Sequence, residues 1–324
     1  MAKSMAVRLR ERLRSWRRRR AGVPPRPEWV QVEINNTCNL KCVMCPRSSL
    51  GRSPRHMTLT EFKDIADKCQ AAGVPRLRLF FMGEPLLHPD LLDMIAYAKQ
   101  IGISDVEFNT NAALLSEDKA RAILASGLDE IVFSLDGADK ETYEAVRVGA
   151  EWETVSANVE RFCRLRKESG QAKPRTRVQT MVMERTRGQI PAFRARWESL
   201  ADEVAVQCVR EYHGLEGLRT TQVLPGDELR PCPAPWTYLV ILADLRVVPC
   251  CEDISGQMTL GNVADTDILT LWREAPRLQA LRERQLQYDY RGFPRCAECE
   301  VPNLSLVQRK AAAAAAESGP RTSP

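Results

Sequence analysis

Strand-like and helix-like segments alternate over most of the first two thirds of the chain, and this alternation limits the folds that the sequence can adopt. Repeated strand–helix units predict parallel strands with helices packed on them. Because six units fall short of the eight that close a TIM barrel, we expect an α/β fold with a partial, open (βα)6 TIM-like barrel. The expected strands are 30–34, 76–81, 105–110, 130–135, 176–183 and 203–209, and the expected helices are 60–71, 91–101, 117–126, 152–168 and 189–200.

Polar motifs follow the carboxyl ends of the first four expected strands. Cys38–Cys45 follows the first strand and Gly83-Glu84-Pro85 follows the second. Asn109-Thr110-Asn111 comes at the end of the third, and Ser134-Leu-Asp136-Gly137 ends the fourth. In βα barrels the loops at this rim converge on one site. We therefore expect one shared pocket at the carboxyl ends of the strands.

The first motif has the spacing Cys-x3-Cys-x2-Cys, with thiols at Cys38, Cys42 and Cys45. A loop this compact can place three thiolates around one corner of an iron–sulfur cube, which leaves one iron open for chemistry. The alternatives are a zinc knuckle and three unrelated thiols. A structural zinc site needs a fourth ligand, and His56 is the one candidate nearby.

The pattern changes after Arg210, where several prolines interrupt it and a new set of cysteines appears. A second, smaller domain beginning near 215–230 is expected. Four of its thiols can close a second 4Fe–4S cluster or, equally, a four-cysteine zinc site. Cys251 is an additional thiol beside one of them, and Cys69, Cys163 and Cys208 are expected in the core. The four candidate ligands are Cys232, Cys250, Cys296 and Cys299.

Taken together, the motifs of residues 28–210 resemble the radical S-adenosylmethionine (SAM) superfamily. The resemblance implies that Cys38, Cys42 and Cys45 bind the SAM cluster and that Gly83-Glu84-Pro85 meets the methionine amino group of SAM. Reductive cleavage of SAM would then give a 5′-deoxyadenosyl radical that takes hydrogen from the substrate. Asp136 is either another contact with SAM or the N-cap of a helix. Other implied SAM contacts are Asn109, Asn111, Ser134, Arg147 and Met44, the last replacing an aromatic residue that is frequent in the family.

Residues 230–300 resemble the SPASM extension of that superfamily, in its shortened single-cluster form called twitch. The cysteine layout is similar to that of 2-deoxy-scyllo-inosamine dehydrogenase-like members. This resemblance implies a radical SAM oxidoreductase that oxidises a carbinol of a sugar-like or aminocyclitol-like small molecule. The auxiliary 4Fe–4S cluster would accept the electron, and an external donor such as flavodoxin or ferredoxin would supply electrons. Arg210, in Arg210-Glu-Tyr-His213, is a candidate substrate contact, and an ordinary polar loop is its alternative.

Other reactions are compatible with the same motifs. Many SPASM proteins modify peptides, and related epimerases use a free thiol such as Cys251 to return hydrogen to the substrate; its alternative is a packed or incidental thiol. The segment before Trp29 is too short for a leader-binding domain, which favours a small substrate. A non-enzymatic iron–sulfur or zinc scaffold, binding a partner through its basic arm, is the remaining alternative.

The two ends of the chain differ from its body in charge and complexity. Met1 to Arg20 contains Lys3, eight arginines and Glu11, a local charge of +8, whereas the whole chain is +5 and the remainder therefore −3. The body gives no indication of a nucleic-acid surface. The arm at 1–27 is a solvated arm or a candidate for weak membrane-surface association through residues 1–20, and 306–324 is expected to be disordered.

The remaining expectations concern the domain bounds, membrane spans and the cellular compartment. The expected domains are the barrel at 28–214 and the cluster domain at 215–305. No run of about 18 apolar residues is present, so no membrane span is expected. Eleven cysteines in a chain without a secretory signal fit a reducing compartment, and we expect a cytoplasmic protein.

Overall fold

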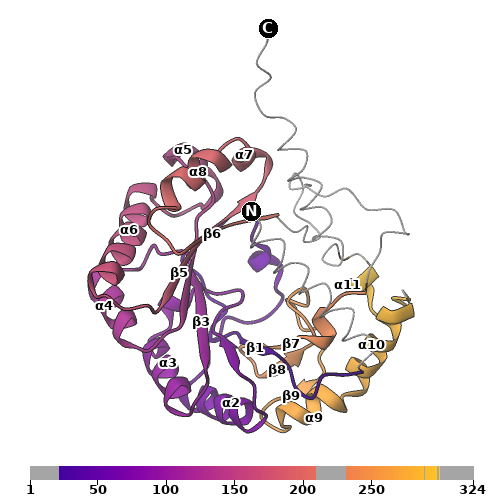
Figure 1. The fold of residues 1–324 in the computed structure, drawn as a ribbon. Helices are drawn as coiled ribbons and strands as arrows, with labels where there is room; N and C mark the ends of the chain where they lie inside the picture. The colour runs from indigo at the N-terminus through magenta and orange to yellow at the C-terminus, as the bar shows by residue number, and fades with distance from the viewer. Residues whose placement is uncertain (1–21, 209–230, 288, 298, 300–324) are drawn as a thin grey trace.

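A computed structural model describes residues 22–208, 231–287, 289–297 and 299. It contains a nine-stranded sheet with the order β6-β5-β4-β3-β2-β1-β7-β8-β9. The first six strands are parallel to their neighbours, and helices cover the outer face of the curved sheet without closing it into a barrel (Figure 1). The expected open, partial barrel is confirmed.

The observed elements agree closely with the expected ones in the barrel. The third strand and the long helix have the expected bounds, and the others differ mainly at their ends. The strands are β1 (Trp29–Val32), β2 (Arg76–Arg78), β3 (Asp105–Thr110), β4 (Glu130–Ser134), β5 (Arg175–Val182) and β6 (Glu203–Cys208). The helices are α2 (Leu59–Ala71), α3 (Leu91–Gln100), α4 (Glu117–Ala125), α5 (Lys140–Val146), α6 (Trp152–Glu168), α7 (Glu184–Arg187) and α8 (Ile190–Trp197), with 3-10 turns η1 (Pro46–Ser49) and η2 (Pro85–Leu87).

Local signals set the helix starts. Thr58 caps α2 through a capping box, in which its hydroxyl accepts from the Glu61 N–H and the Glu61 carboxylate accepts in return. Asp139 caps α5, a helix that the sequence pattern did not predict because it is only two turns long. Asp136, which the sequence analysis gives as a possible N-cap, lies before α5 and has different partners.

The core lies between the outer face of the sheet and the helices. Alternate strand residues, such as Leu77, Phe108 and Phe133, are fully buried there. The intervening residues of the same strands face the other way, to the inner face of the half-barrel. Polar and charged side chains predominate on the inner face of β2 to β6, because the apolar residues of these strands face the helices.

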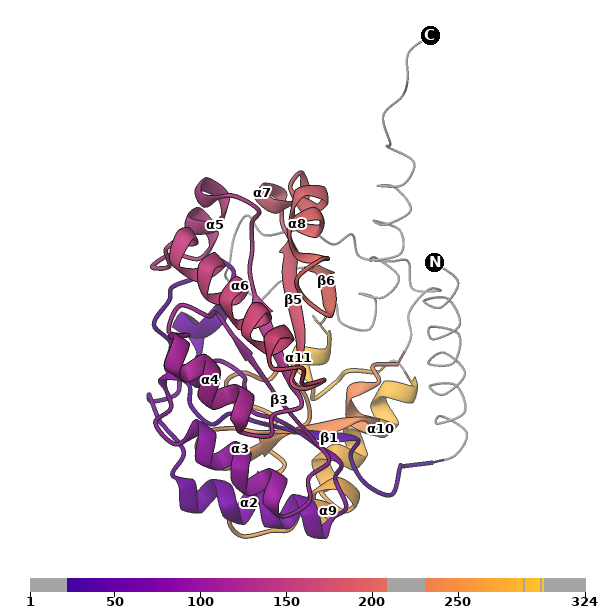
Figure 2. The ribbon, with the colours of Figure 1, turned by 60° about the vertical axis from the view of Figure 1, so that its left-hand side comes forward.

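The C-terminal segment continues the same sheet, which the sequence pattern did not predict. β7 (Tyr238–Ile241) pairs in parallel with β1, and β8 (Arg246–Val248) and β9 (Gly261–Asn262) follow antiparallel. The views in Figures 1 and 2 place the remaining helices beside this extension. These are η4 (Ala234–Trp236), α9 (Ile268–Arg273), α10 (Pro276–Gln287) and α11 (Pro294–Ala297).

Some expectations concern residues outside the described ranges. They are the basic arm at 1–20, the boundary near 215–230, Arg210 and the tail at 306–324. Among the described residues, no helix has the length and apolarity that crossing a bilayer requires.

Candidate functional site

The cysteine loop is fixed to the last residue of α5 and to the segment that follows it. The Lys41 N–H donates to the Val148 carbonyl over 2.9 Å and the Val43 N–H donates to the Val146 carbonyl over 3.0 Å. These two bonds flank Cys42, so the loop is held along its length. The loop therefore presents three half-buried thiols, none in a disulfide, at the carboxyl end of β1: Cys38, Cys42 and Cys45.

Hydrogen-bond donors are already directed at the sulfurs of this loop. The Leu40 N–H lies 3.4 Å from Cys38 Sγ, and the Asn111 amide nitrogen lies 3.8 Å from the same atom. Arg147 Nη1 lies 3.8 Å from Cys42 Sγ. Such donors stabilise metal-bound thiolates. Burial raises the pKa of Cys38 and Cys42, so cluster loading would release protons.

Glu84 joins the loops after β2 and β3. Its buried carboxylate accepts from the Thr110 hydroxyl over 2.7 Å, the Asn111 N–H over 2.8 Å and the Leu86 N–H over 3.0 Å. Burial nevertheless raises the pKa of this carboxyl. Because the carboxylate already accepts three hydrogen bonds, the main-chain carbonyls of Gly83-Glu84-Pro85 are the groups best suited to bind a ligand ammonium. The SAM contact of this motif stays a prediction.

Gly83 is required by the close approach of another loop. An alanine Cβ there would lie 2.3 Å from the Asn35 carbonyl oxygen, and Asn35 also donates to the Glu84 carbonyl. We expect Gly83→Ala to cost about 1–3 kcal/mol of stability through overpacking and to weaken SAM binding. Chemical denaturation and a SAM binding isotherm would measure both effects.

Gly188→Ala is the matched control, because nothing lies within 4 Å of the added carbon. Unchanged stability and SAM affinity in Gly83→Ala would contradict the assignment of a tight contact at this position.

The remaining predicted contacts lie around the same rim. Asn111 is buried and also donates to the Asn39 side chain over 3.0 Å. Met44 is buried in a small cluster with Val146 and Met183. Asn109 lies half-buried on β3, next to Val132 of β4. All three are thus near the cysteine loop or the adjoining inner face.

Arg147 has protein partners at its guanidinium. It donates through Nε to Asp136 Oδ2 over 2.7 Å, and Nη2 lies 2.6 Å from the same oxygen. Asp136 Oδ1 in turn accepts the Met181 N–H over 2.7 Å. Asp136 therefore positions Arg147 beside Cys42, and pairing of Arg147 with the SAM carboxylate stays a prediction.

Two glutamines on the inner face are linked to Ser134, one of the predicted SAM contacts, and were missed in the sequence. Gln179 Nε2 donates to Ser134 Oγ over 3.0 Å, and Gln207 Nε2 donates to Gln179 Oε1 over 3.1 Å. They occupy alternate, inward positions of the fifth and sixth expected strands. Their polarity at every second position was the signal that could have identified them.

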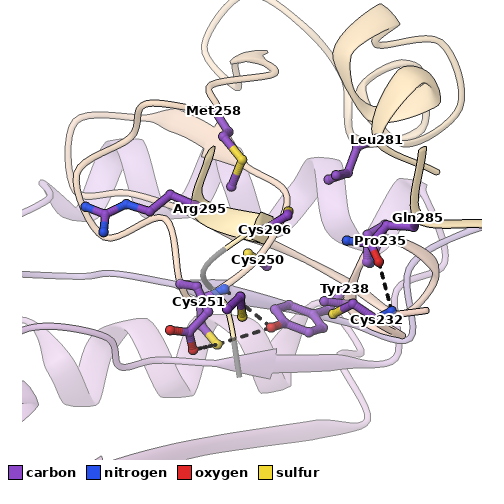
Figure 3. A pocket seen from close by; sticks show the side chains of 13 residues that line it. Cys232, Pro235, Tyr238, Cys250, Cys251, Met258, Leu281, Gln285, Arg295 and Cys296 are labelled. Carbon is purple, nitrogen blue, oxygen red and sulfur yellow. Dashed lines mark hydrogen bonds between the residues drawn. The ribbon is translucent and has the colours of Figure 1, made fainter. Parts of the chain in front are cut away.

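The second set of thiols lines a single pocket beside β7 (Figure 3). Cys232 precedes β7, whereas Cys250 and Cys251 follow β8, which is antiparallel to β7; all three therefore lie at the amino end of β7. Burial raises the pKa of the Cys232 thiol to about 12 and that of Cys296 to about 11. The pocket's five thiols, called here the auxiliary cage, are Cys232, Cys250, Cys251, Cys296 and Cys299.

Both thiol groups fit clusters by their donor chemistry. In the described part of the chain, no three His, Cys, Asp or Glu side chains are grouped closely enough to hold one metal ion. A cube does not require such close grouping, because each thiolate binds a different iron. His56, the candidate zinc ligand, lies instead 2.7 Å from the Thr37 hydroxyl through Nε2.

Comparison with protein families identifies both parts of the chain. Residues 32–183 match the radical SAM superfamily, and residues 232–300 match SPASM, an iron–sulfur cluster-binding domain. The chain carries a radical SAM domain followed by a SPASM domain. Radical SAM and SPASM domains bind SAM and 4Fe–4S clusters, so we assign clusters and not zinc to the two groups of thiols.

Relatives of this radical SAM/SPASM protein have different activities. A probable GTP 3′,8-cyclase of Methanothermobacter marburgensis is 30% identical over 40% of this chain and 42% of its own length. The chain thus spans less than half of the cyclases that it matches. The mycofactocin maturase MftC of Mycobacterium ulcerans is 26% identical over 80% of this chain and 78% of its own.

Solved structures are similar in fold. SuiB of Streptococcus suis has a TM-score of 0.68 at 16% identity, covering 81% of this chain and 69% of SuiB. BtrN, in complex with AdoMet and 2-DOIA, has a TM-score of 0.52 at 18% identity, covering 85% of this chain and 91% of BtrN. At these identities the likeness establishes the fold alone.

Proposed function

We propose that this protein is an oxidoreductase that removes a hydrogen atom from a carbinol carbon of a sugar-like or aminocyclitol-like small molecule. Loss of the hydroxyl proton to a base and of one further electron then leaves a ketone. In this proposal Cys38, Cys42 and Cys45 hold the SAM cluster, and the cage cysteines hold an auxiliary cluster that accepts the second electron. When bound, the first cluster and SAM supply the hydrogen-abstracting radical. An external electron donor, such as flavodoxin or ferredoxin, belongs to the same proposal.

The observation that carries this proposal is the placement of the two thiol groups on one sheet. The cysteine loop follows the carboxyl end of β1, and the cage lies at the amino end of β7, which pairs with β1. The inner face of the half-barrel connects the two ends. A substrate on that face would lie between the group that removes hydrogen and the group that accepts an electron, as a two-electron oxidation requires.

The side chains on the inner face support a polar substrate. The Gln207–Gln179–Ser134 chain offers amide and hydroxyl groups, which both donate and accept. Gln31 adds another amide, which donates to the Phe80 carbonyl over 3.0 Å. Such groups can orient hydroxyl or amino substituents, so that one carbinol C–H faces the cysteine loop and the other substituents point toward the strands.

The test is the yield of oxidised product per SAM cleaved. We expect about one ketone per 5′-deoxyadenosine, since each abstraction would complete one two-electron oxidation. Reconstituted protein would be assayed with a panel of sugars and aminocyclitols under anaerobic reduction. Cys296→Ala, with an incomplete cage, should still cleave SAM but give no ketone. Deoxyadenosine without oxidised product across the panel would contradict the proposal.

Peptide modification is a second candidate, favoured by one observation. The alignment with the mycofactocin maturase extends over 80% of this chain, which is more than the radical SAM domain alone occupies. The amide-rich inner face would also suit a peptide backbone. Loss of two hydrogens from a short peptide encoded beside this gene, with no reaction on sugars, would favour this candidate. In a third reaction, epimerisation, Cys251 would return a hydrogen to the substrate.

A further inference from the structure

Arg282 is a buried cation without an acidic partner. Among the described residues, the buried arginines are Arg147, Arg166 and Arg282. Arg147 pairs with Asp136 over 2.6 Å, and Arg166 has the same distance to a carboxylate oxygen of Asp202. Arg282 is only 4% exposed and forms no ion pair with any residue that the structure describes. Burying a cation is costly unless a negative charge lies near it, so this position needs a counter-charge from another source.

The groups that contact the guanidinium of Arg282 are neutral. Its Nε donates to the Pro235 carbonyl over 2.9 Å, and its Nη1 donates to the Trp272 carbonyl over 2.7 Å. The guanidinium carbon lies 4.4 Å from the centroid of the fully buried Trp272 ring. Nη2 is buried and has no hydrogen-bond partner within the described ranges. Burial lowers the pKa of Arg282 only to about 10, so the side chain is charged at neutral pH.

Arg282 lies directly behind the wall of the auxiliary cage. Leu281 and Gln285 of α10 line the pocket, and so does Pro235, whose carbonyl accepts from Arg282 (Figure 3). Arg282 is three residues before Gln285, so the two side chains lie on the same side of the helix. Gln285 Oε1 in turn accepts the Cys232 N–H over 3.0 Å. The positive charge is therefore separated from the cage by the residues of the pocket wall.

An iron–sulfur cluster in the cage has the charge that the surroundings of Arg282 lack. Thiolate ligation makes a 4Fe–4S cluster anionic, and reduction adds one more electron to it. Where water is excluded, the effective dielectric constant is low and Coulomb interactions are strong. A buried cation nearby therefore stabilises the reduced cluster more than the oxidised cluster, and this raises the reduction potential.

We propose that the guanidinium of Arg282 raises the reduction potential of the auxiliary cluster and thereby favours its reduction. Other charges also lie beside the cage: Glu252 and Arg295 line the pocket, and Asp253 acts on Cys296. The variants described below leave these charges in place, so a change in potential reports on Arg282. The inference rests on the SPASM domain and not on the substrate. It applies to any reaction in which this cluster accepts an electron.

The test is a redox titration of the auxiliary cluster in a background that lacks the first cluster, made with Cys38→Ala, Cys42→Ala and Cys45→Ala. Iron analysis should give about four irons per chain, and the electron paramagnetic resonance signal of the reduced cluster reports the midpoint potential. Arg282→Met and Arg282→Gln both remove the charge. We expect each to shift the equilibrium about tenfold toward the oxidised cluster, which corresponds to a potential lower by about 59 mV.

Three further comparisons separate charge from other effects of the substitution. Glutamine can donate to a carbonyl and methionine cannot, so similar shifts in the two neutral variants assign the effect to charge. Arg282→Lys keeps the charge and should keep a potential near that of the parent. Arg277→Gln is the matched control, because Arg277 is an exposed residue of the same helix whose charge is screened by water and salt. Its potential should be unchanged.

The inference would be overturned by an unchanged potential in both neutral variants, or by an equal drop in Arg282→Lys. Failure of both neutral variants to load the cluster would show a structural role instead and would also overturn it. If methionine alone prevents loading, Arg282→Gln still gives the potential. No substrate is present in this titration, so absence of the proposed oxidation would leave its result intact.

Discussion

Replacing Arg52 with alanine should lower the free energy of unfolding by about 3–5 kcal/mol, because it leaves a buried carboxylate without its charge partner. Arg52 donates to both oxygens of Glu33, over 2.6 and 2.8 Å, and the two side chains are 4% and 0% exposed. Arg52 Nε also donates to the Ile254 carbonyl over 2.8 Å, and Glu33 accepts the Ala243 N–H over 2.9 Å. The pair thus ties the loop after the first cysteines to the C-terminal extension.

The loss of folding stability in Arg52→Ala should depend on pH. Burial raises the pKa of Glu33 even with Arg52 present, and removal of Arg52 would raise it further. A folded-state pKa above the ordinary value of about 4.3 means that the folded protein holds this proton while the unfolded chain releases it. The stability that this group contributes is therefore lost as the pH rises through its folded-state pKa, and the loss of stability in Arg52→Ala should be smaller at about pH 4 than at about pH 7. Urea denaturation at both pH values measures this.

Two variants control for general effects of losing an arginine. Arg121 and Glu117 form an exposed pair on α4, with side chains 61% and 52% exposed, so Arg121→Ala should cost less than about 1 kcal/mol. Arg52→Lys keeps the charge but not the two-pronged geometry, and should be intermediate. Equal costs for Arg52→Ala and Arg121→Ala would show that the buried pair contributes no special stability.

Removal of the three thiols of the first loop should abolish SAM cleavage altogether. With Cys38, Cys42 and Cys45 all changed to alanine, the loop has no ligand for a cube, and iron should fall from about eight to about four per chain. The fold should persist, since the loop is held by main-chain bonds to residues 146–148. Iron analysis and a deoxyadenosine assay on reduced protein measure the outcome.

Cys69→Ala is the matched control for that experiment. Cys69 is a fully buried thiol of α2 in the apolar core, and its replacement should leave iron content and SAM cleavage unchanged. Deoxyadenosine formation by the triple variant at the wild-type rate would refute the assignment of this loop as the SAM-cluster site.

Much of the barrel was predictable because its signals are local. Strand and helix periodicity located the six βα units, and a threonine with a glutamate three residues on marked the start of α2. The short α5 was missed, since a helix of seven residues has little periodic signal of its own. The addition of β7 next to β1 was also missed, because parallel pairing between strands some 200 residues apart has no local signature.

The candidate site also has a part that the sequence predicted and a part that it did not. Cysteine spacing and the motifs at strand ends were enough to identify the residues of the rim. The partners of those residues were not predictable, and Glu84 illustrates the difference. Its carboxylate accepts hydrogen bonds from Thr110, Asn111 and Leu86, and the local sequence around Glu84 does not indicate these partners.

The amino-acid sequence alone specifies the chemistry that this protein can carry: which thiols are available, in what spacing, and on which loops of a parallel sheet. How those thiols are supported depends on the folded chain. Folding joins the auxiliary cage to the barrel sheet through β7, pairs Glu33 with Arg52, and places Tyr238 against Cys251. The physical reason is that ligand type and spacing are properties of short segments. Hydrogen-bond partners and burial depend on which distant segments the fold brings together.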